Sequence, residues 1–403
     1  MNLKNIICNT ALLLVMGLPC IAQQKNTFKP QAALLATINK NMVDADAQYK
    51  VFAGDLQPGQ FPKNFDPKTG KLETSNSGWW CSGFYPGTLL NIYEETRDEK
   101  LMHEARRMLN LLAKEQYNTH THDLGFMMYC SFGTANRLAP SPDYKTVLLN
   151  SAKSLATRFN PKVGAIKSWD AKPSDFLVII DNMMNLELLF WATKATGDSS
   201  YYKIAVTHAN TTIKNHYRAN HSSYHVINYH PETGAVQQKK TAQGFADESA
   251  WARGQAWGLY GFTVMYRETG DKQYLEQANS IARYLLNNPN LPADKIPYWD
   301  FNADNIPNAL RDASAAAIMA SALLELCKYT GKADGQQYFN TAADIIKTLS
   351  TPQYKSAPGA NGGFLLQHSV GHLPAGTEVD VPLTYADYYF VEAMKRYKAF
   401  AGK

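Results

Sequence analysis

A short turn between two helices recurs along this chain, and it restricts the fold more than any other feature. In each copy Thr-Gly-Asp, or a close variant, follows a strongly apolar segment and precedes an amphipathic one, with a Tyr and an Ala downstream. Glycine suits the left-handed residue that ends one helix, and aspartate caps the start of the next. The copies are Thr96-Arg97-Asp98, Thr196-Gly197-Asp198, Thr269-Gly270-Asp271, Thr330-Gly331-Lys332 and, more faintly, Pro142-Asp143-Tyr144. One such turn indicates only good capping, whereas repeated copies predict a repeated helical hairpin.

Two kinds of helical segment alternate between these turns. Amphipathic segments, which bury one face, are expected at about 101–116, 146–159, 200–216, 273–287 and 337–349. Segments that are apolar on almost every side, and are therefore buried all round, are expected at 176–195, 250–267, 313–329 and 385–400. Five turns separate six hairpins, so buried inner and half-buried outer helices predict an all-α, single-domain (α/α)6 barrel. An open helical solenoid is the alternative, but it needs a shorter and more regular repeat.

Long connections precede the expected inner helices, at roughly 118–122, 160–174, 220–247 and 288–311. They are rich in Trp, His and Asp. In a closed ring of hairpins these connections meet at one end of the barrel. We therefore expect the ligand site at that end.

The composition excludes several classes of protein. With 45% apolar and 19% charged residues the chain is not intrinsically disordered, and five cysteines in 403 residues do not make a disulfide-stapled miniprotein. The net charge of +5 is not gathered into a basic stripe, so we expect no nucleic-acid partner. Polar residues interrupt every long apolar run beyond the first segment, so we expect no membrane partner either.

The first segment, residues 1–22, predicts an export signal. Lys4 supplies the positive charge, residues 6–16 the apolar stretch, and Cys20-Ile21-Ala22 a small-x-small cleavage pattern. The stretch is shorter than the roughly 18 apolar residues that a membrane span needs. Pro19 argues against lipid attachment at Cys20. We therefore expect an exported, periplasmic protein whose mature chain, residues 23–403, is one catalytic domain. Its remaining cysteines, which no metal-site spacing links, are expected to be buried thiols: Cys81, Cys130 and Cys327.

Two carboxylates stand out in apolar surroundings. Asp123 lies just ahead of an apolar helix, where it is either an ordinary N-cap or a functional acid. A metal site through His120, His122 and Asp123 lacks a further ligand that the sequence advertises. Asp181 lies inside an expected apolar helix, where an unpaired charge is costly, so it is paired, protonated or functional. Asn185, one turn on, is a candidate partner; the functional alternative is a proton donor with a raised pKa.

A third motif places Arg253 and Trp257 four residues apart on one face of an inner helix, and Gly254 and Gly258 are expected to keep that face open. A planar cation beside an indole suits a sugar carboxylate whose ring stacks on the aromatic side chain. The alternative is a core Trp beside a salt-bridged Arg.

Together these motifs resemble a known family. Trp79 to Gly87, His122 to Phe126, Asp181-Asn182, Ala252 to Trp257 and Arg311 to Ala315 are similar, in the same order, to the unsaturated glucuronyl hydrolases of glycoside hydrolase family 88. The likeness runs from about residue 74 to residue 397. It implies an (α/α)6 barrel and a glycosidase that acts on lyase-generated, glycosaminoglycan-type oligosaccharides ending in a 4,5-unsaturated uronic acid. Such enzymes hydrate the C4=C5 enol ether, and neither the residues nor the resemblance requires a cofactor or a metal.

The resemblance also implies roles for single residues. Asp181 matches the general acid and base, and Asp123 matches a second essential carboxylate. The residues that match substrate contacts or pocket walls are His122, His225, Gln243, Arg253, Trp257, Trp80, Trp169 and Ser369. Ser369 begins Ser369-Val370-Gly371-His372, where His replaces a Lys that family members acting on sulfated fragments can carry. A neutral imidazole is a weaker partner for sulfate than an ammonium group.

Two other functions remain as alternatives. One is an unsaturated rhamnogalacturonyl hydrolase acting on pectin fragments, and the other is a non-catalytic, exported sugar-binding barrel. A buried Asp181 has no use in a binding protein, and the pairing of Asp123 with Asp181 favours the glucuronyl group. The protein is expected to be a monomer or a homodimer.

Overall fold

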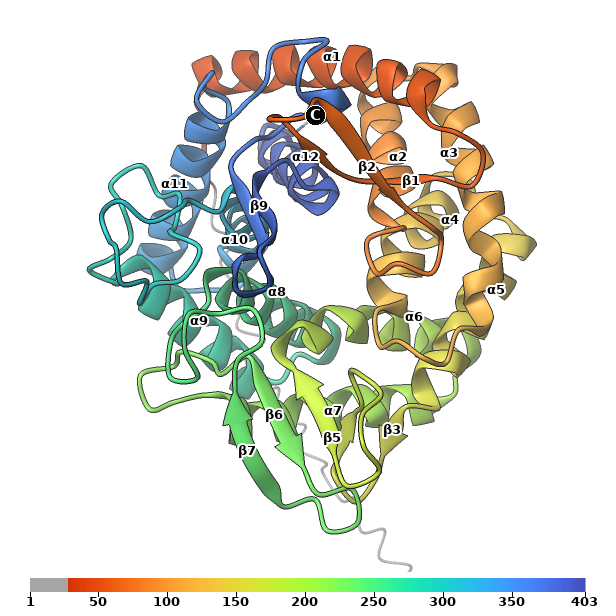
Figure 1. Ribbon diagram of the computed structural model, residues 1–403, viewed down its shortest axis with the longest axis vertical. Helices are drawn as coiled ribbons and strands as arrows, with labels where there is room; N and C mark the ends of the chain where they lie inside the picture. Colours follow the sequence, from red (N-terminus) through yellow and green to blue (C-terminus); the bar gives the residue numbers. More distant parts are fainter. Residues whose placement is uncertain (1–27, 403) are drawn as a thin grey trace, which may run out of the picture.

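The computed structural model describes residues 28–402, which form an (α/α)6 barrel (Figure 1). The expected export signal, residues 1–22, lies outside the described residues. Within residues 28–402 no helix combines the length and the apolar character that crossing a membrane requires. Cys81 and Cys327 are buried as expected, whereas Cys130 is only partly buried, and the three form no disulfide in this part of the chain.

The inner ring of the barrel consists of helices that contact one another in sequence. Each contacts the next, and the last contacts the first, so the ring is closed and the open solenoid is wrong. Their apolar side chains pack into one continuous core. The ring comprises α2 (Phe84–Thr96), the π-helix η2 (Gly125–Gly133) continued by α4 (Thr134–Leu138), α6 (Leu186–Thr196), α8 (Ala252–Thr269), α10 (Ala313–Leu326) and α12 (Thr384–Ala399).

An outer ring of amphipathic helices covers this inner ring (Figure 1). Each outer helix packs on an inner neighbour, which explains why only one of its faces is apolar. The outer ring comprises α1 (Ala32–Asp55), α3 (Glu99–Leu112), α5 (Pro142–Ala156), α7 (Ser199–His216), α9 (Lys272–Leu286) and α11 (Lys332–Leu349). The alternation expected from the sequence is confirmed.

Three of the recurring turns, at Asp98, Asp198 and Asp271, have the expected aspartate cap, whereas Ser141 caps α5 and α11 begins at Gly331 without a side-chain cap. Asp198 accepts a bond from the Ser200 N–H at 2.8 Å, and Asp271 accepts one from the Gln273 N–H at 3.0 Å. Gly197 ends α6 in the left-handed region with a φ of 78°. In these three turns the Thr has a use that the sequence did not suggest. Thr196, for example, donates to the Ala192 carbonyl and accepts from the Asp198 N–H, which closes the helix end.

Short strands lie between the helices, and the sequence did not predict them. Antiparallel hairpins are formed by β1 (Phe61–Asp66) with β2 (Lys71–Ser75), β3 (Phe159–Asn160) with β4 (Ala165–Ile166), and β8 (Ser369–His372) with β9 (Thr377–Val381). A three-stranded sheet contains β5 (Phe176–Ile179), β6 (Val226–Tyr229) and β7 (Val236–Lys240).

The expected helix at 176–195 is therefore wrong over its first half. Residues 176–179 form β5, residues 180–185 form the 3-10 helix η3 (Ile180–Asn185), and only then does α6 begin. The apolar run Phe-Leu-Val-Ile pairs with β6 in register, and that long-range pairing overrides the helical pattern.

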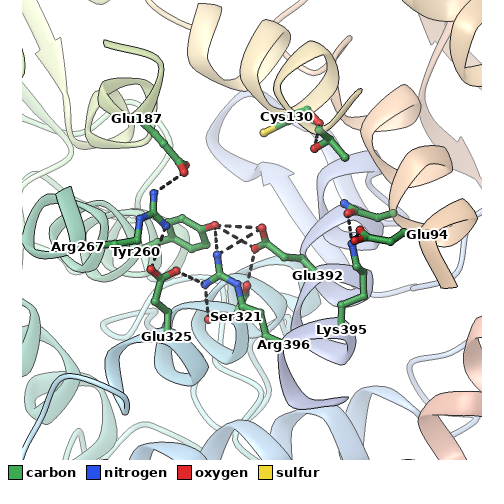
Figure 2. Close-up of polar contacts among 12 residues, drawn as sticks. Glu94, Cys130, Glu187, Tyr260, Arg267, Ser321, Glu325, Glu392, Lys395 and Arg396 are labelled. Carbon is green, nitrogen blue, oxygen red and sulfur yellow. Dashed lines mark hydrogen bonds and ion pairs between the residues drawn. The ribbon is translucent and has the colours of Figure 1, made fainter. Parts of the chain in front are cut away.

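The end of the barrel where the inner helices begin is called the mouth here, and the other end the base. The base contains a cavity of about 580 Å³ whose walls include Glu187, Glu392 and Arg396. Charged side chains pair with one another there (Figure 2). Arg396 forms ion pairs with Glu325 at 2.9 Å and with Glu392 at 3.5 Å, and Arg267 bridges Glu325 and Glu187. These pairs tie α6, α8, α10 and α12 together.

Candidate active site

A cavity of about 330 Å³ opens at the mouth, where loops preceding several inner helices meet as expected. Most of the predicted site residues line it, although they come from segments far apart in the sequence. Those that line it are Trp80, His122, Asp123, Trp169, Asp181, Gln243 and Arg253. The structure also places Thr121 and His372 in the wall, and leaves His225, Trp257 and Ser369 behind it.

Asp181 lies in the first turn of η3, directly after β5, and not inside an α-helix as predicted. The sheet fixes this position because the neighbouring Ile180 N–H donates to the His225 carbonyl at 3.0 Å. Asp181 is 7% exposed, and its Oδ2 has no hydrogen-bond partner within the described chain. Burial raises the pKa of Asp181 to about 7, with Arg253 opposing the shift and Asp123 adding to it. A carboxyl group with this pKa exchanges a proton readily near neutral pH.

Asn185 does not bond to Asp181, so that expectation is wrong. The Asn185 Oδ1 instead accepts the Phe126 N–H at 3.0 Å, and the Asn185 backbone fills the space beside Gly125. Asn185 therefore joins η3 to η2 and leaves the Asp181 carboxyl without a partner on its own segment.

His225 stands behind Asp181 with its tautomer defined by its contacts. Its Nδ1 accepts the backbone N–H groups of Ala242 and Gln243 at 3.1 and 3.2 Å, so the ring proton is assigned to Nε2. The Nε2 lies 3.7 Å from the Asp181 Oδ2, slightly beyond a hydrogen bond. Burial lowers the pKa of His225 far below its usual value, and Arg253 adds to the effect, so the ring is neutral.

Asp123 faces the same cavity and does not act as a helix cap. Its Oδ2 accepts the Thr121 hydroxyl at 2.8 Å, and its Oδ1 lies 3.3 Å from the His122 Nε2. Burial lowers the pKa of His122, although the Asp123 charge opposes this. The Thr121 hydroxyl oxygen also accepts the Asp123 N–H at 3.0 Å. A hydroxyl two residues before a carboxylate is the sequence signal that could have identified this turn.

The residues of the suggested metal site point in different directions. His120 is exposed and lies 3.4 Å from Asp170, whereas His122 is buried against Asp123. Within residues 28–402 no group of three His, Cys, Asp or Glu side chains is placed to hold a metal ion.

Arg253 is held by the protein more firmly than the sequence suggested. Its guanidinium donates to the Asp312 carboxylate at 3.2 Å, to the Gly371 carbonyl at 2.6 Å and to the Val370 carbonyl. It also stacks on the Trp251 ring, with 4.5 Å between the guanidinium carbon and the ring centroid. Arg253 therefore fixes the β8–β9 hairpin and at the same time places a positive charge in the cavity wall.

The expectation of an open face around Gly254 and Gly258 is wrong. A Cβ atom at Gly254 would lie 2.7 Å from the Trp251 ring, and one at Gly258 would lie 2.3 Å from the Tyr217 hydroxyl. The glycines thus admit two aromatic side chains and do not open a cleft. Trp257 is fully buried against Phe126, with ring centroids 4.9 Å apart. Its indole nitrogen has no hydrogen-bond partner within residues 28–402, and Trp257 is not among the residues that line the cavity, so the ring packs behind the wall.

Ser369 is fully buried at the start of β8 and does not reach the cavity. The same strand delivers His372 to the cavity wall, where the His372 Nε2 lies 2.9 Å from the Ala242 carbonyl oxygen. This contact joins the β8–β9 hairpin to the loop that carries Gln243.

The sequence and the fold both match known proteins. Residues 56–400 match the profile of Glycosyl Hydrolase Family 88. An unsaturated glucuronyl hydrolase of Formosa agariphila is 43% identical over 394 residues, which cover 96% of this chain and 97% of that protein. An unsaturated chondroitin disaccharide hydrolase of Streptococcus agalactiae is 33% identical over 325 residues, covering 79% and 81% of the two chains. The crystal structure of an unsaturated glucuronyl hydrolase specific for heparin superposes with a TM-score of 0.89 and 48% identity over 91% of this chain and 98% of that one.

Proposed function

Because the chain belongs to glycosyl hydrolase family 88, we propose that it removes the 4,5-unsaturated uronic acid from the non-reducing end of oligosaccharides that polysaccharide lyases produce. The chain is a glycosidase, and its relatives are named for unsaturated glucuronyl and chondroitin disaccharide substrates. The observation that carries the mechanism is Asp181, a buried carboxyl group with a pKa of about 7 in the wall of the mouth cavity.

Asp181 is the proton donor and acceptor of the reaction. In its protonated form it delivers a proton to C4 of the C4=C5 enol ether, and the π electrons form the new C4–H bond. Positive charge then develops at C5, where water attacks and returns one proton to the Asp181 carboxylate. The product is a hemiketal that opens and releases the shortened saccharide. A pKa near the working pH suits both proton transfers.

Asp123 and Arg253 supply charge on the cavity wall. The Asp123 carboxylate, held by the Thr121 hydroxyl, stabilises the positive charge that develops at C5 in the transition state. Arg253 attracts the carboxylate of the unsaturated uronate, although its guanidinium is bonded within the protein. The indoles of Trp80 and Trp169 line the same space and suit the faces of a sugar ring.

His225 positions the acid and does not transfer protons itself. It is neutral, and its Nε2–H faces the Asp181 Oδ2 at 3.7 Å. A neutral neighbour leaves the Asp181 carboxyl free to gain and lose its proton, whereas a charged imidazolium would hold it ionised.

The saccharide beside the uronate is of the glycosaminoglycan type and is preferred without sulfate at this position. His372 occupies the wall where a lysine would offer a cation. Its Nε2 contacts a carbonyl oxygen, so the proton is on that nitrogen and Nδ1 is left as an acceptor. An acceptor suits a sugar hydroxyl better than a sulfate oxygen.

The test is a panel of lyase-generated disaccharides from chondroitin, heparin, hyaluronan and pectin, followed by loss of the ultraviolet absorbance of the C4=C5 bond. We expect turnover of glycosaminoglycan disaccharides by the wild type and none by Asp181→Asn. Turnover of the pectin disaccharide alone would favour the rhamnogalacturonyl alternative. Tight binding without turnover by the wild type would indicate a sugar-binding protein.

We propose that the enzyme is periplasmic, because residues 1–22 have the sequence pattern of an export signal. N-terminal sequencing of the protein recovered from its host should begin near Gln23. A start at Met1, or a lipid on Cys20, would contradict this.

A further inference from the structure

A second hollow of about 320 Å³ is lined by a different set of residues from the mouth cavity. Two chain segments line both spaces. One segment contributes Ala242 and Gln243 to the mouth cavity and Phe245 to the second hollow. The other contributes His372 to the mouth cavity and Leu373 to the second hollow. The second hollow is called the outer hollow below.

The two segments touch each other at residues that line the mouth cavity. The His372 Nε2 lies 2.9 Å from the Ala242 carbonyl oxygen at this contact. The outer hollow therefore begins directly beyond the residues that enclose the reacting sugar. The rim between the two spaces is within reach of sugars that extend out of the mouth cavity.

Phe245 presents an aromatic surface at the rim. It is 43% exposed, and its ring meets the edge of the buried Trp299 with centroids 6.4 Å apart and planes at 80°. The loop under it is anchored, since the Asp300 Oδ2 accepts the Phe245 N–H at 2.9 Å and the Ser249 hydroxyl at 2.6 Å. A large apolar ring on a fixed loop loses little conformational entropy when a sugar face packs on it.

The charge of the outer hollow selects its occupant. Among the residues that line it, Asp304 carries the one ionisable side chain, and Asn305 adds amide groups. A carboxylate and an amide accept and donate hydrogen bonds to hydroxyl groups, but they offer no cation to a sulfate.

We propose that the outer hollow binds an unsulfated sugar of the leaving saccharide, beyond the residue joined to the unsaturated uronate. This rests on the proposed function and extends it, because it makes an oligosaccharide longer than a disaccharide the better substrate. Phe245 supplies the stacking surface, and Asp304 discriminates against sulfate.

The test compares an unsaturated disaccharide and an unsaturated tetrasaccharide from the same unsulfated polymer. Phe245→Ala should raise KM for the tetrasaccharide about tenfold and leave the disaccharide unchanged. The matched control is Tyr117→Ala, which removes another exposed aromatic ring that lies in neither space. It should change neither substrate.

A second variant tests the charge. Asp304→Asn should lower KM for a sulfated tetrasaccharide by about twofold to fivefold while the unsulfated one changes little. If Phe245→Ala changed KM equally for the disaccharide and the tetrasaccharide, or changed neither, the result would contradict sugar binding in the outer hollow and leave the proposed function intact. A wild-type enzyme that turns over neither substrate would instead overturn the proposed function, and this inference with it.

Discussion

The mouth and the base of the barrel both bury charged groups, but they treat them differently. At the mouth, the Asp181 Oδ2 and the His225 Nε2 have no hydrogen-bond partner in the part of the chain described. At the base, Arg396 and Glu325 each have several partners, and together with the Arg267–Glu187 pair they bridge four inner helices (Figure 2). The pKa values of one carboxyl group at each end, Asp181 and Glu325, also move in opposite directions. Burial raises the pKa of Asp181 to about 7, whereas at Glu325 the effect of Arg396 and Arg267 exceeds that of burial and lowers the pKa to about 2.

This difference separates a site kept for a ligand from a site kept for stability. A buried polar atom without a partner is unfavourable in the folded protein, so its retention indicates a use that the folded protein alone does not satisfy. A buried charge whose partners are all present needs no ligand. We therefore expect changes at the mouth to alter catalysis, and changes at the base to alter the free energy of unfolding.

The largest expected effect is that of Asp181→Asn on turnover. Asparagine keeps the shape of the side chain but has no acidic proton, so kcat should fall by about 10²–10⁴-fold or more, since one group makes both proton transfers. Substrate binding and folding should persist. Wild-type turnover in deuterated water should place one deuterium at C4 on a single face, as detected by NMR of the product. Near wild-type kcat in Asp181→Asn would move the acid role to Asp123.

Glu325→Gln at the base should have the opposite profile. It removes the charge that Arg267 and Arg396 share, and breaking a buried ion pair typically lowers the free energy of unfolding by about 3–5 kcal/mol. Chemical denaturation measures this, and kcat should stay at the wild-type value. The matched control is Glu232→Gln, since Glu232 pairs with Lys162 on the surface and its removal should change stability little. If Glu325→Gln lowered kcat without lowering the free energy of unfolding, the assignment of the base to stability and of the mouth to catalysis would be wrong.

Features that the sequence predicted correctly depend on residues close together in the chain. The turns at Asp198 and Asp271 are examples, because each cap bonds an N–H two residues away. The candidate carboxylates were also visible, since a charge such as Asp181 in an apolar run is unusual whether the run forms a helix or a strand. Periodicity alone did not show that residues 176–179 pair with β6, because the partner strand lies far along the chain.

The site details that the sequence missed depend on distant partners. The spacing of Arg253 and Trp257 placed them on one helix, but it said nothing of the Asp312 carboxylate or the Gly371 carbonyl that hold the guanidinium. The tautomer of His225 is likewise defined by two backbone N–H groups from another loop. Glycines in a helix indicate close contact, but the sequence does not tell whether a ligand or a side chain makes it.

The raised pKa of Asp181 predicts two pH dependences of intermediate size. The acid must be protonated, so kcat/KM should fall about tenfold per pH unit above about 7. Stability follows the same group, because its folded pKa lies above its unfolded value. That contribution is fully present below about pH 4 and is lost as the pH rises through about 7.

Thermal unfolding of the wild type and Asp181→Asn across this range measures the second effect. The variant lacks the titrating group. As the pH rises, the Tm of the variant should therefore increase relative to the Tm of the wild type. A constant difference between the two Tm values would show that Asp181 is not held with a raised pKa.

The smallest expected effect concerns the turns at the base, where the fourth copy lacks a capping side chain. Gly331 is the N-cap of α11 with a φ of −57°, which any residue adopts, and a Cβ atom there would meet nothing within 4 Å. Gly331→Ser should therefore raise the free energy of unfolding by about 0.5 kcal/mol, through a cap bond and a less flexible unfolded chain. Asp271→Ala is the matched opposite, because it removes an existing cap and should lower stability by about 1 kcal/mol. Denaturation midpoints measure both changes, and kcat should remain that of the wild type. A change in kcat from either variant would mean that residues at the base affect catalysis at the mouth. That would contradict the division of stability and catalysis between the two ends.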